Sequence, residues 1–186
     1  MRNGSGDRVV VDVESVERRA AGRSITVASA VPKGDRADWM IEKLSELGVA
    51  AFIPLRTARS VVHPEGAGKL DRWNRIAVEA AKQSRRNGVM RIEPLASLTS
   101  LLPKIEPGEG IFFSTGDAPI VGTITAPKAS TLLIGPEGGW TADEEAAMRS
   151  RGLTPASPVP TILRIETAAV LSAGVLMLLS QEHDHS

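Results

Sequence analysis

The chain has 186 residues, which suits one domain of ordinary size with a substantial hydrophobic core. Its 22 basic residues balance its 22 acidic residues, so net charge alone does not indicate a nucleic-acid-binding protein. The absence of cysteine excludes disulfides, thiol nucleophiles and cysteine-ligated metals; it fits a reducing cytoplasm, and we expect no metal site.

Short apolar segments alternate with amphipathic segments along the chain. Residues 38–47 carry apolar side chains at helical spacing and are followed by Gly48, a common helix C-cap. The expected strands are residues 8–13, 24–28, 49–55, 92, 110–114, 131–134 and 160–164. The expected helices are residues 38–47, 70–86, 98–102, 142–151 and 167–180. This alternation predicts an α/β fold with a mostly parallel sheet covered by helices on both faces.

Charge is unevenly distributed along the sequence. Residues 56–91 contain nine Lys or Arg and three acidic residues, whereas residues 106–146 contain seven acidic residues and one Lys. The chain is therefore electrically polarised, with its basic residues concentrated in one segment.

Two features bear on membranes and secretion. No apolar run follows the charged residues of segment 1–7, so we expect no secretory signal. The longest apolar stretch, residues 168–179, is shorter than the roughly 20 residues needed to cross a bilayer. We therefore expect no membrane span and interpret the stretch as a buried helix.

The most informative segment is the glycine-rich turn that follows residues 131–134. Gly135, Gly138 and Gly139 can adopt positive φ or let a ligand approach the main chain, so a side chain at Gly138 is expected to occupy ligand space. Thr141 and Glu144 fit a capping box, which predicts a helix starting at Ala142. A strand that ends beside a helix N-terminus is typical of ligand sites in α/β proteins. The alternative is a purely structural turn. A P-loop is excluded because no Gly-Lys-Ser/Thr follows.

A second junction between a strand and a helix lies at residues 162–169. It carries one cation, one anion and one hydroxyl, on Arg164, Glu166 and Thr167. Taken alone, these residues are explained by an Arg164–Glu166 salt bridge and a helix cap. However, adjacent parallel strands end at the same edge of a sheet, so this junction and the glycine-rich turn are expected to lie together.

The final helix is apolar around much of its circumference. One small domain has too little surface to cover all the large side chains of this helix, which predicts an obligate homodimer. The side chains concerned are Leu171, Val175, Leu176, Leu178 and Leu179.

Seven motifs in order resemble one known family. They are Lys33-Gly34-Asp35-Arg36, residues 41–49, Arg59-Ser60-Val61-Val62, Arg72-Trp73, and residues 79–86, 134–139 and 162–168. Together they resemble the RsmE family of 16S ribosomal RNA uridine-N3 methyltransferases, in the SPOUT superfamily. The resemblance covers residues 31–179, about four-fifths of the chain.

The resemblance implies a division of the chain and a cofactor. Residues 31–186 would form a homodimeric SPOUT domain, a parallel sheet with a C-terminal trefoil knot, and residues 1–30 a remnant of a β-rich, PUA-like RNA-binding domain. S-adenosylmethionine would bind among three loops. The implied cofactor-binding residues are Phe113, Ser114, Thr115, Ile134, Gly135, Pro136, Glu137, Gly138, Gly139, Ile162, Leu163, Arg164 and Thr167.

The resemblance also implies roles in catalysis and RNA binding. Arg164 would stabilise the uridine anion, while Glu166 or a water would take the N3 proton. The substrate would be 16S ribosomal RNA or the small ribosomal subunit, in the cytoplasm. The residues expected to hold RNA phosphates are Arg56, Arg59, Lys82, Arg85 and Arg86. The alternative for any of these is a solvated helix face, or, for Arg85 and Arg86, stabilisation of a helix dipole.

Two other functions stay open at this point. Pro158-Val159-Pro160-Thr161 stands where the family has Leu-Gly-Pro-Arg, and only the last strands of the N-terminal domain are expected. These departures favour a noncatalytic RNA-binding or ribosome-assembly protein that retains the knotted dimer. An α/β enzyme that uses a nucleotide is less well supported, because no phosphate-binding lysine accompanies the glycines.

Overall fold

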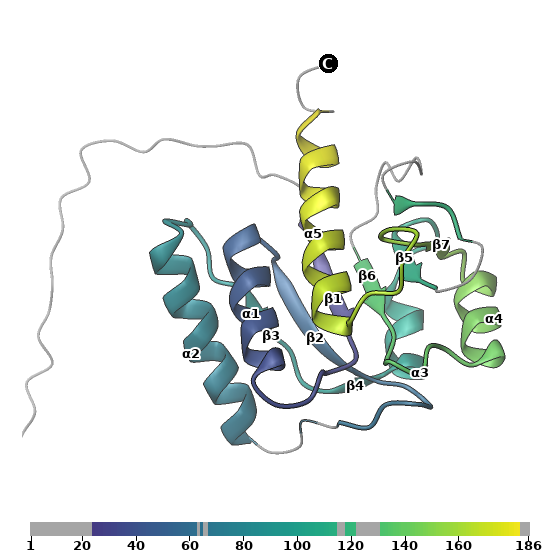
Figure 1. Ribbon diagram of the computed structural model, residues 1–186, viewed down its shortest axis with the longest axis horizontal. Coiled ribbons are helices and arrows are strands. Elements are labelled where there is room, and N and C mark those ends of the chain that lie inside the picture. Colours follow the sequence, from purple (N-terminus) through teal and green to yellow (C-terminus); the bar gives the residue numbers. More distant parts are fainter. Residues whose placement is uncertain (1–23, 63, 65–66, 115–117, 122–130, 183–186) are drawn as a thin grey trace, which may run out of the picture.

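The computed structural model describes residues 24–62, 64, 67–114, 118–121 and 131–182. The expected strand 8–13 and most of the expected N-terminal domain lie outside these residues. Seven strands and five α-helices alternate along the described residues (Figure 1). The strands are β1 (Thr26–Ser29), β2 (Ala51–Arg56), β3 (Arg91–Ile92), β4 (Ala96–Ser97), β5 (Gly110–Phe113), β6 (Thr131–Ile134) and β7 (Thr154–Ala156). The helices are α1 (Arg36–Leu47), α2 (Ala67–Gln83), α3 (Leu98–Leu101), the 3₁₀ helix η1 (Leu102–Lys104), α4 (Ala142–Ser150) and α5 (Ile165–Glu182).

The strands form a single sheet in which every described pairing is parallel. Its order is β3-β2-β1-β6-β5-β7, and β4 pairs with the end of β2. The predicted α/β fold with a mostly parallel sheet is confirmed. β1 lies in the centre of the sheet, so residues 26–29 belong to it although the expected domain boundary follows residue 30.

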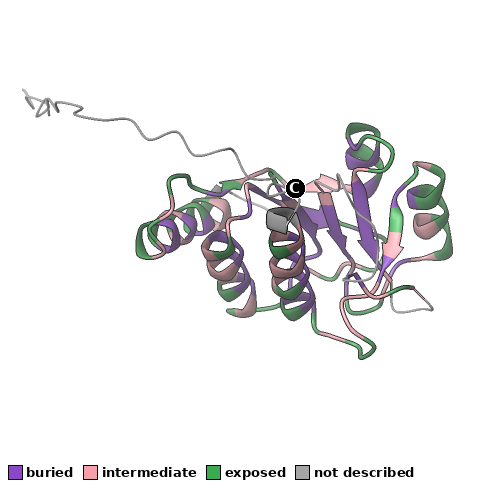
Figure 2. Ribbon diagram, turned by 90° about the horizontal axis from the view of Figure 1, so that it is seen from above, coloured by how far each residue is buried: buried purple, intermediate pink, exposed green. Residues whose placement is uncertain are grey.

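Helices cover both faces of the sheet, and the alternation of side chains along each strand explains how. Leu132 and Ile134 of β6 are buried in a core with α1, α2 and α5, whereas Leu133 is buried in a second core with α3 and α4. Figure 2 shows the buried residues concentrated in the sheet and on the helix faces that contact it. The fold is therefore a three-layer α/β/α arrangement, with short strands that are apolar on both sides.

The helix α1 ends as its sequence predicts and packs tightly on α2. Gly48 adopts φ 102° and its N–H bonds to the carbonyls of the last turn. Trp73 of α2 is fully buried, meets the Phe52 ring edge-on at 5.8 Å, and donates its indole N–H to Asp38 at 2.9 Å. The indole thus joins α1, α2 and β2.

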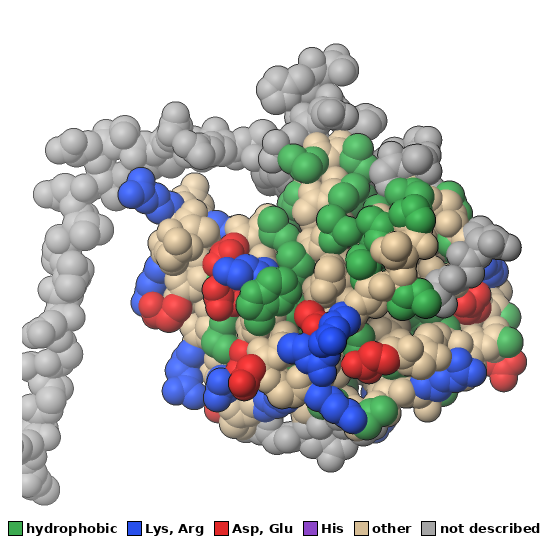
Figure 3. Space-filling view, in the orientation of Figure 1, with side chains coloured by type: hydrophobic (Ala, Val, Ile, Leu, Met, Phe, Trp, Pro, Cys, Tyr) green, Lys and Arg blue, Asp and Glu red, His purple; other side chains and the backbone are tan. Residues whose placement is uncertain are grey.

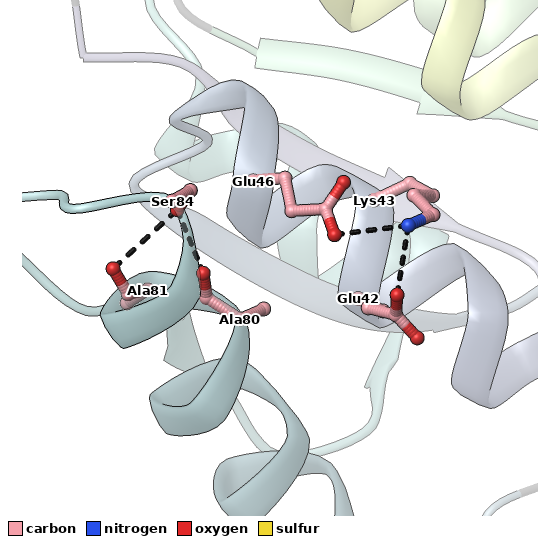
Figure 4. A network of polar contacts seen from close by, with 6 residues as sticks. All are labelled: Glu42, Lys43, Glu46, Ala80, Ala81 and Ser84. Atoms are coloured by element: carbon pink, nitrogen blue, oxygen red, sulfur yellow. Dashed lines mark hydrogen bonds and ion pairs between the residues drawn. The ribbon is translucent and has the colours of Figure 1, made fainter.

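The solvent side of these helices carries local polar contacts (Figure 4). Lys43 donates to Glu42 at 2.7 Å and to Glu46 at 2.9 Å, and these hydrogen bonds raise the pKa of Lys43 above its usual value. The Ser84 hydroxyl donates a hydrogen bond to the Ala80 carbonyl at 2.7 Å, as serine does at the end of a helix. Such exposed pairs add little stability, so the packing of the buried faces holds the helices in place.

The end of α2 and the region after α4 differ from the sequence prediction. The helix ends at Gln83 and not at Arg86, because a Schellman turn follows: Arg86 N–H bonds to the Ala81 carbonyl, and Arg85 takes φ 55°. The predicted strand 160–164 is wrong, and β7 lies at residues 154–156. Pro158 and Pro160 lack the N–H that a strand needs, whereas Pro155 is tolerated because β7 is an edge strand.

Candidate functional site

A cavity of about 410 Å³ lies where β5, β6 and β7 end. Its volume is in the range of small-molecule sites. Three segments and the start of α5 line it: residues 113–114, 134–140 and 157–163, together with Ile165 and Ala168. Ala118 and Ile120 complete its wall. The predicted meeting of the glycine-rich turn and the 162–168 junction at one edge of the sheet is therefore observed.

Trp140 holds the glycine-rich turn against the neighbouring strand. Its indole N–H donates to the Phe113 carbonyl at 2.8 Å, and the ring packs on Gly135, where an added Cβ would lie 3.0 Å from a ring carbon. Gly139 takes φ +67° and donates its N–H to the Pro136 carbonyl at 2.8 Å. Gly135 is thus required by close packing and Gly139 by its backbone conformation.

The predicted capping box begins α4. The Glu144 N–H donates to the Thr141 hydroxyl at 3.2 Å, and the Thr141 N–H donates to the Glu144 carboxylate at 2.9 Å. The other oxygen of Glu144 accepts the Ala58 N–H at 2.8 Å, from the loop after β2. The cap of α4 is therefore tied to a segment that is distant in sequence.

Arg59, on the same loop, also contacts the turn. Its Nη1 donates to the carbonyl of Gly138 at 2.7 Å and to that of Trp140 at 3.2 Å. A Cβ added to Gly138 would meet the aliphatic part of Arg59 at 3.4 Å, in ordinary contact. The expectation that a side chain at Gly138 occupies ligand space stays a prediction, and the first atom of such a side chain would lie beside Arg59, which also lines the cavity.

The lining of the cavity combines apolar walls with few charges. Ile134, Leu163 and Ile165 contribute apolar surface, while Glu137 and Glu145 bring carboxylates and Arg59 is the cation of the lining. Glu145 accepts a hydrogen bond from the Ser114 hydroxyl at 3.0 Å. This lining suits a ligand with an apolar body and a positively charged group, and it suits a polyphosphate poorly.

The structure brings most of the expected cofactor residues to this cavity. Those that line it are Phe113, Ser114, Ile134, Gly135, Pro136, Glu137, Gly138, Gly139, Ile162 and Leu163. Thr115 lies outside the described residues. Arg164 and Thr167 do not line the cavity and are exposed, because the side chains of Leu163, Ile165 and Ala168 take the cavity side of this segment.

Glu166 also lies off the cavity, buried at the first turn of α5. It is 6% exposed and pairs with Arg36 at 3.7 Å, so its partner is not Arg164, the sequence neighbour considered above. Its Oε2 has no hydrogen-bond partner among the described residues. A carboxylate at this end of a helix is favoured by the helix dipole.

The basic residues expected to bind RNA separate into two groups. Arg56 ends β2 and Arg59 follows it, at the same edge as the cavity, and Arg56 lines a second groove between α3 and α4. Lys82, Arg85 and Arg86 lie at the end of α2, near the opposite edge of the sheet. Exposed Lys82 pairs with Glu79 at 2.8 Å.

Arg86 is engaged within the protein. Its guanidinium donates to the carbonyls of Ser45 at 2.7 Å and Gly48 at 3.1 Å, at the end of α1. Burial lowers the pKa of Arg86 from its usual value. The residue therefore stabilises the end of α1, a helix different from the one that the sequence suggested.

Sequence reasoning missed several residues of the cavity. Trp140 directly follows the turn and could have been found as its only large apolar neighbour. Residues 158–161 were noted only as a departure from the family pattern and, from residue 160, as the start of the expected strand 160–164. No local signal marks Arg59 as a neighbour of residues 138–140, because this contact depends on how distant strands pair.

Within the described residues, no helix is long and apolar enough to span a membrane. In the same part of the chain, His, Asp and Glu side chains form no group of three or more suited to a metal ion.

Comparisons with known proteins agree with this architecture. A family model described as an RNA methyltransferase domain matches residues 20–177. The Ribosomal RNA small subunit methyltransferase E of Bacillus subtilis is 36% identical over 173 residues, which cover 86% of this chain and 68% of that protein.

Solved structures extend the likeness. The Ribosomal RNA small subunit methyltransferase E of Neisseria gonorrhoeae, solved bound to S-adenosyl methionine, superposes with a TM-score of 0.77 at 33% identity, covering 84% of this chain and 66% of that one. A TrmH/SpoU tRNA modifying enzyme of A. aeolicus shares the fold, with a TM-score of 0.59 at 12% identity over 88% of this chain and 78% of that one. The chain spans about two thirds of the length of the methyltransferase E relatives described above.

Proposed function

The chain belongs to the RNA methyltransferase family, and we propose that it transfers a methyl group from S-adenosylmethionine to N3 of a specific uridine in 16S ribosomal RNA. The observation that carries the proposal is the cavity where β5, β6 and β7 end, in a chain 36% identical to a small-subunit ribosomal RNA methyltransferase. We expect the protein to act in the cytoplasm, on 16S RNA or the small subunit.

The residues of the cavity fit this cofactor. The apolar walls of Ile134 and Leu163 suit an adenine ring, and the carboxylates of Glu137 and Glu145 suit the cationic groups of a sulfonium amino acid. Residues 113–114, 135–139 and 162–163 would hold it. Bound there, S-adenosylmethionine supplies an electrophilic methyl group.

Two charged residues at the start of α5, which do not line the cavity, have proposed roles toward the uridine. N3 of uridine carries a proton that must leave before or during methylation, so a negative charge develops on the base. Exposed Arg164 would stabilise this charge. Glu166 would accept the proton through a water, because its Oε2, which has no partner among the described residues, is buried off the cavity.

We further propose that the protein is a homodimer. α5 exposes Leu178 (68%) and Leu171 (37%), and α1 exposes Trp39 (44%). Figure 3 shows hydrophobic side chains gathered along α5 on this face. Leu176, by contrast, is buried in the chain's own core. A second copy would cover the exposed side chains. Sedimentation equilibrium should give twice the chain mass at micromolar protein, and a monomer mass would contradict the proposal.

The decisive experiment is methylation of small ribosomal subunits that lack this modification. Mass spectrometry of digested 16S RNA should detect one N3-methyluridine that depends on protein and S-adenosylmethionine. Arg164→Ala should reduce the product and leave cofactor binding unchanged. If the wild-type chain binds cofactor and small subunits but forms no N3-methyluridine, the catalytic proposal fails and the alternative of a noncatalytic assembly protein is favoured.

A further inference from the structure

The loop after β2 contacts the cofactor turn through more than one bond. Arg59 binds two carbonyls of the turn, at Gly138 and Trp140, and the neighbouring Ala58 binds the carboxylate of Glu144 that caps α4. These partners are 79 to 86 residues apart in sequence. Contacts of this kind arise only from the pairing order of the sheet.

Each peptide whose carbonyl binds Arg59 also has its N–H in a hydrogen bond. The carbonyl of Gly138 shares a planar peptide with the N–H of Gly139, which bonds to the Pro136 carbonyl at 2.8 Å. The carbonyl of Trp140 likewise shares a peptide with the N–H of Thr141, which bonds to Glu144 at 2.9 Å. Each of these two peptides, 138–139 and 140–141, therefore has both its carbonyl and its N–H in a hydrogen bond.

Charge and position agree with a role at the cofactor turn. Arg59 lines the cavity, and its Nη1, which carries two hydrogens, donates to both carbonyls. Arg56, three residues earlier, lines the second groove, and among the described residues no hydrogen bond or ion pair joins it to the turn. A guanidinium that binds two main-chain carbonyls has fewer donors left for an RNA phosphate.

We propose that Arg59 is a positioning residue that fixes the glycine-rich turn for cofactor binding, in addition to or in place of any contact with RNA. This inference rests on the proposed use of S-adenosylmethionine. Through the Ala58–Glu144 bond, the same loop also fixes the start of α4. Without the guanidinium, the peptides 138–139 and 140–141 lose one of their two anchors, and the turn samples orientations that do not fit the ligand.

The test compares Arg59→Ala with Arg56→Ala in the full chain. Calorimetric titration with S-adenosylhomocysteine should show about 10- to 100-fold weaker binding for Arg59→Ala, as expected when a binding element loses its support, and no change for Arg56→Ala. Arg59→Lys, which keeps the charge, should fall between Arg59→Ala and wild type. In turnover assays, the KM for S-adenosylmethionine should rise while the KM for small subunits stays constant.

Hydrogen exchange separates positioning from a general loss of stability. In Arg59→Ala without ligand, exchange should rise in residues 136–145 and stay unchanged in α1 and α2. Equal cofactor affinity in Arg59→Ala and wild type overturns the inference, as does faster exchange throughout the chain. Failure of the wild-type chain to bind S-adenosylhomocysteine would instead contradict the proposed function.

Discussion

Arg59 and Arg86 bind main-chain carbonyls at opposite edges of one sheet. Arg86 lies near the amino ends of the strands and bonds to the carbonyls of Ser45 and Gly48. Arg59 lies where the strands end and bonds to those of Gly138 and Trp140. Both were expected to hold RNA phosphates, on the basis of the same basic segment.

The difference between them lies in what each guanidinium stabilises. Arg86 is half-buried and satisfies the end of a helix that belongs to the core, so its loss should affect the whole fold. Arg59 is exposed and supports a turn beside a cavity, so its loss should affect a ligand. A guanidinium bound to two main-chain carbonyls therefore stabilises the fold at one edge of the sheet and supports the proposed site at the other.

Arg86→Ala should have the largest effect on stability. It removes two charged hydrogen bonds, so the Gly48 carbonyl loses its side-chain donor and the Ser45 carbonyl keeps only the Gly48 N–H, which should lower the free energy of unfolding by about 2–4 kcal/mol. At roughly 2–4 °C per kcal/mol, Tm should fall by about 4–16 °C in calorimetry. Cofactor affinity should not change. The control is Lys82→Ala on exposed surface. If Arg86→Ala weakens RNA binding and leaves Tm unchanged, Arg86 binds RNA and does not stabilise α1.

Gly135→Ala should disturb the other edge by a different route. The new methyl group would lie 3.0 Å from the Trp140 ring, and such overpacking costs about 1–3 kcal/mol. The indole must shift by a few tenths of an ångström, which weakens its bond to the Phe113 carbonyl, so S-adenosylhomocysteine should bind more weakly in calorimetric titration. Gly88→Ala, which lies away from the cavity and where an added Cβ meets nothing within 4 Å, is the control. Equal cofactor affinity for both variants would show that Trp140 does not shape the cavity.

Thr141→Ala should have a smaller effect at the same edge. It removes the hydroxyl that accepts the Glu144 N–H, and loss of such a cap costs about 1 kcal/mol. Chemical denaturation should detect this loss with an unchanged m-value. Because Arg59 still holds the turn, cofactor affinity should fall less than in Arg59→Ala. A larger fall would assign the positioning of the turn to the cap of α4.

Arg85→Gly should have the smallest effect on stability. Arg85 is a non-glycine residue at φ 55° within the Schellman turn, and glycine at this position should stabilise the chain by no more than about 1 kcal/mol. If Arg85 holds an RNA phosphate, the variant should weaken RNA binding and lower the log–log salt slope by about one. If the salt slope is unchanged, Arg85, near the amino ends of the strands, has a structural role only.

Much of the fold could be predicted from local pattern. The spacing of apolar residues, Gly48 as a C-cap and the Thr141–Glu144 capping box each act within a few residues, so the sequence determined α1, β6 and the start of α4. The prediction of a strand at residues 160–164 was wrong because it relied on the apolar residues and gave too little weight to the prolines. Ordered motifs similarly identified the family, since they require no knowledge of contacts.

The pairing order of the sheet decided the rest. By placing β6 between β1 and β5, it brings the loop after β2 to residues 138–144, and the return path of α2 carries Arg86 to the opposite edge. Side-chain direction then separates Leu163 and Ile165, which line the cavity, from Arg164 and Glu166, which do not. Sequence spacing alone gives neither result, because contacts between distant segments follow from packing the whole core. Residue types and local elements came from the sequence, and only the tertiary structure determined which arginine supports the fold and which supports the site.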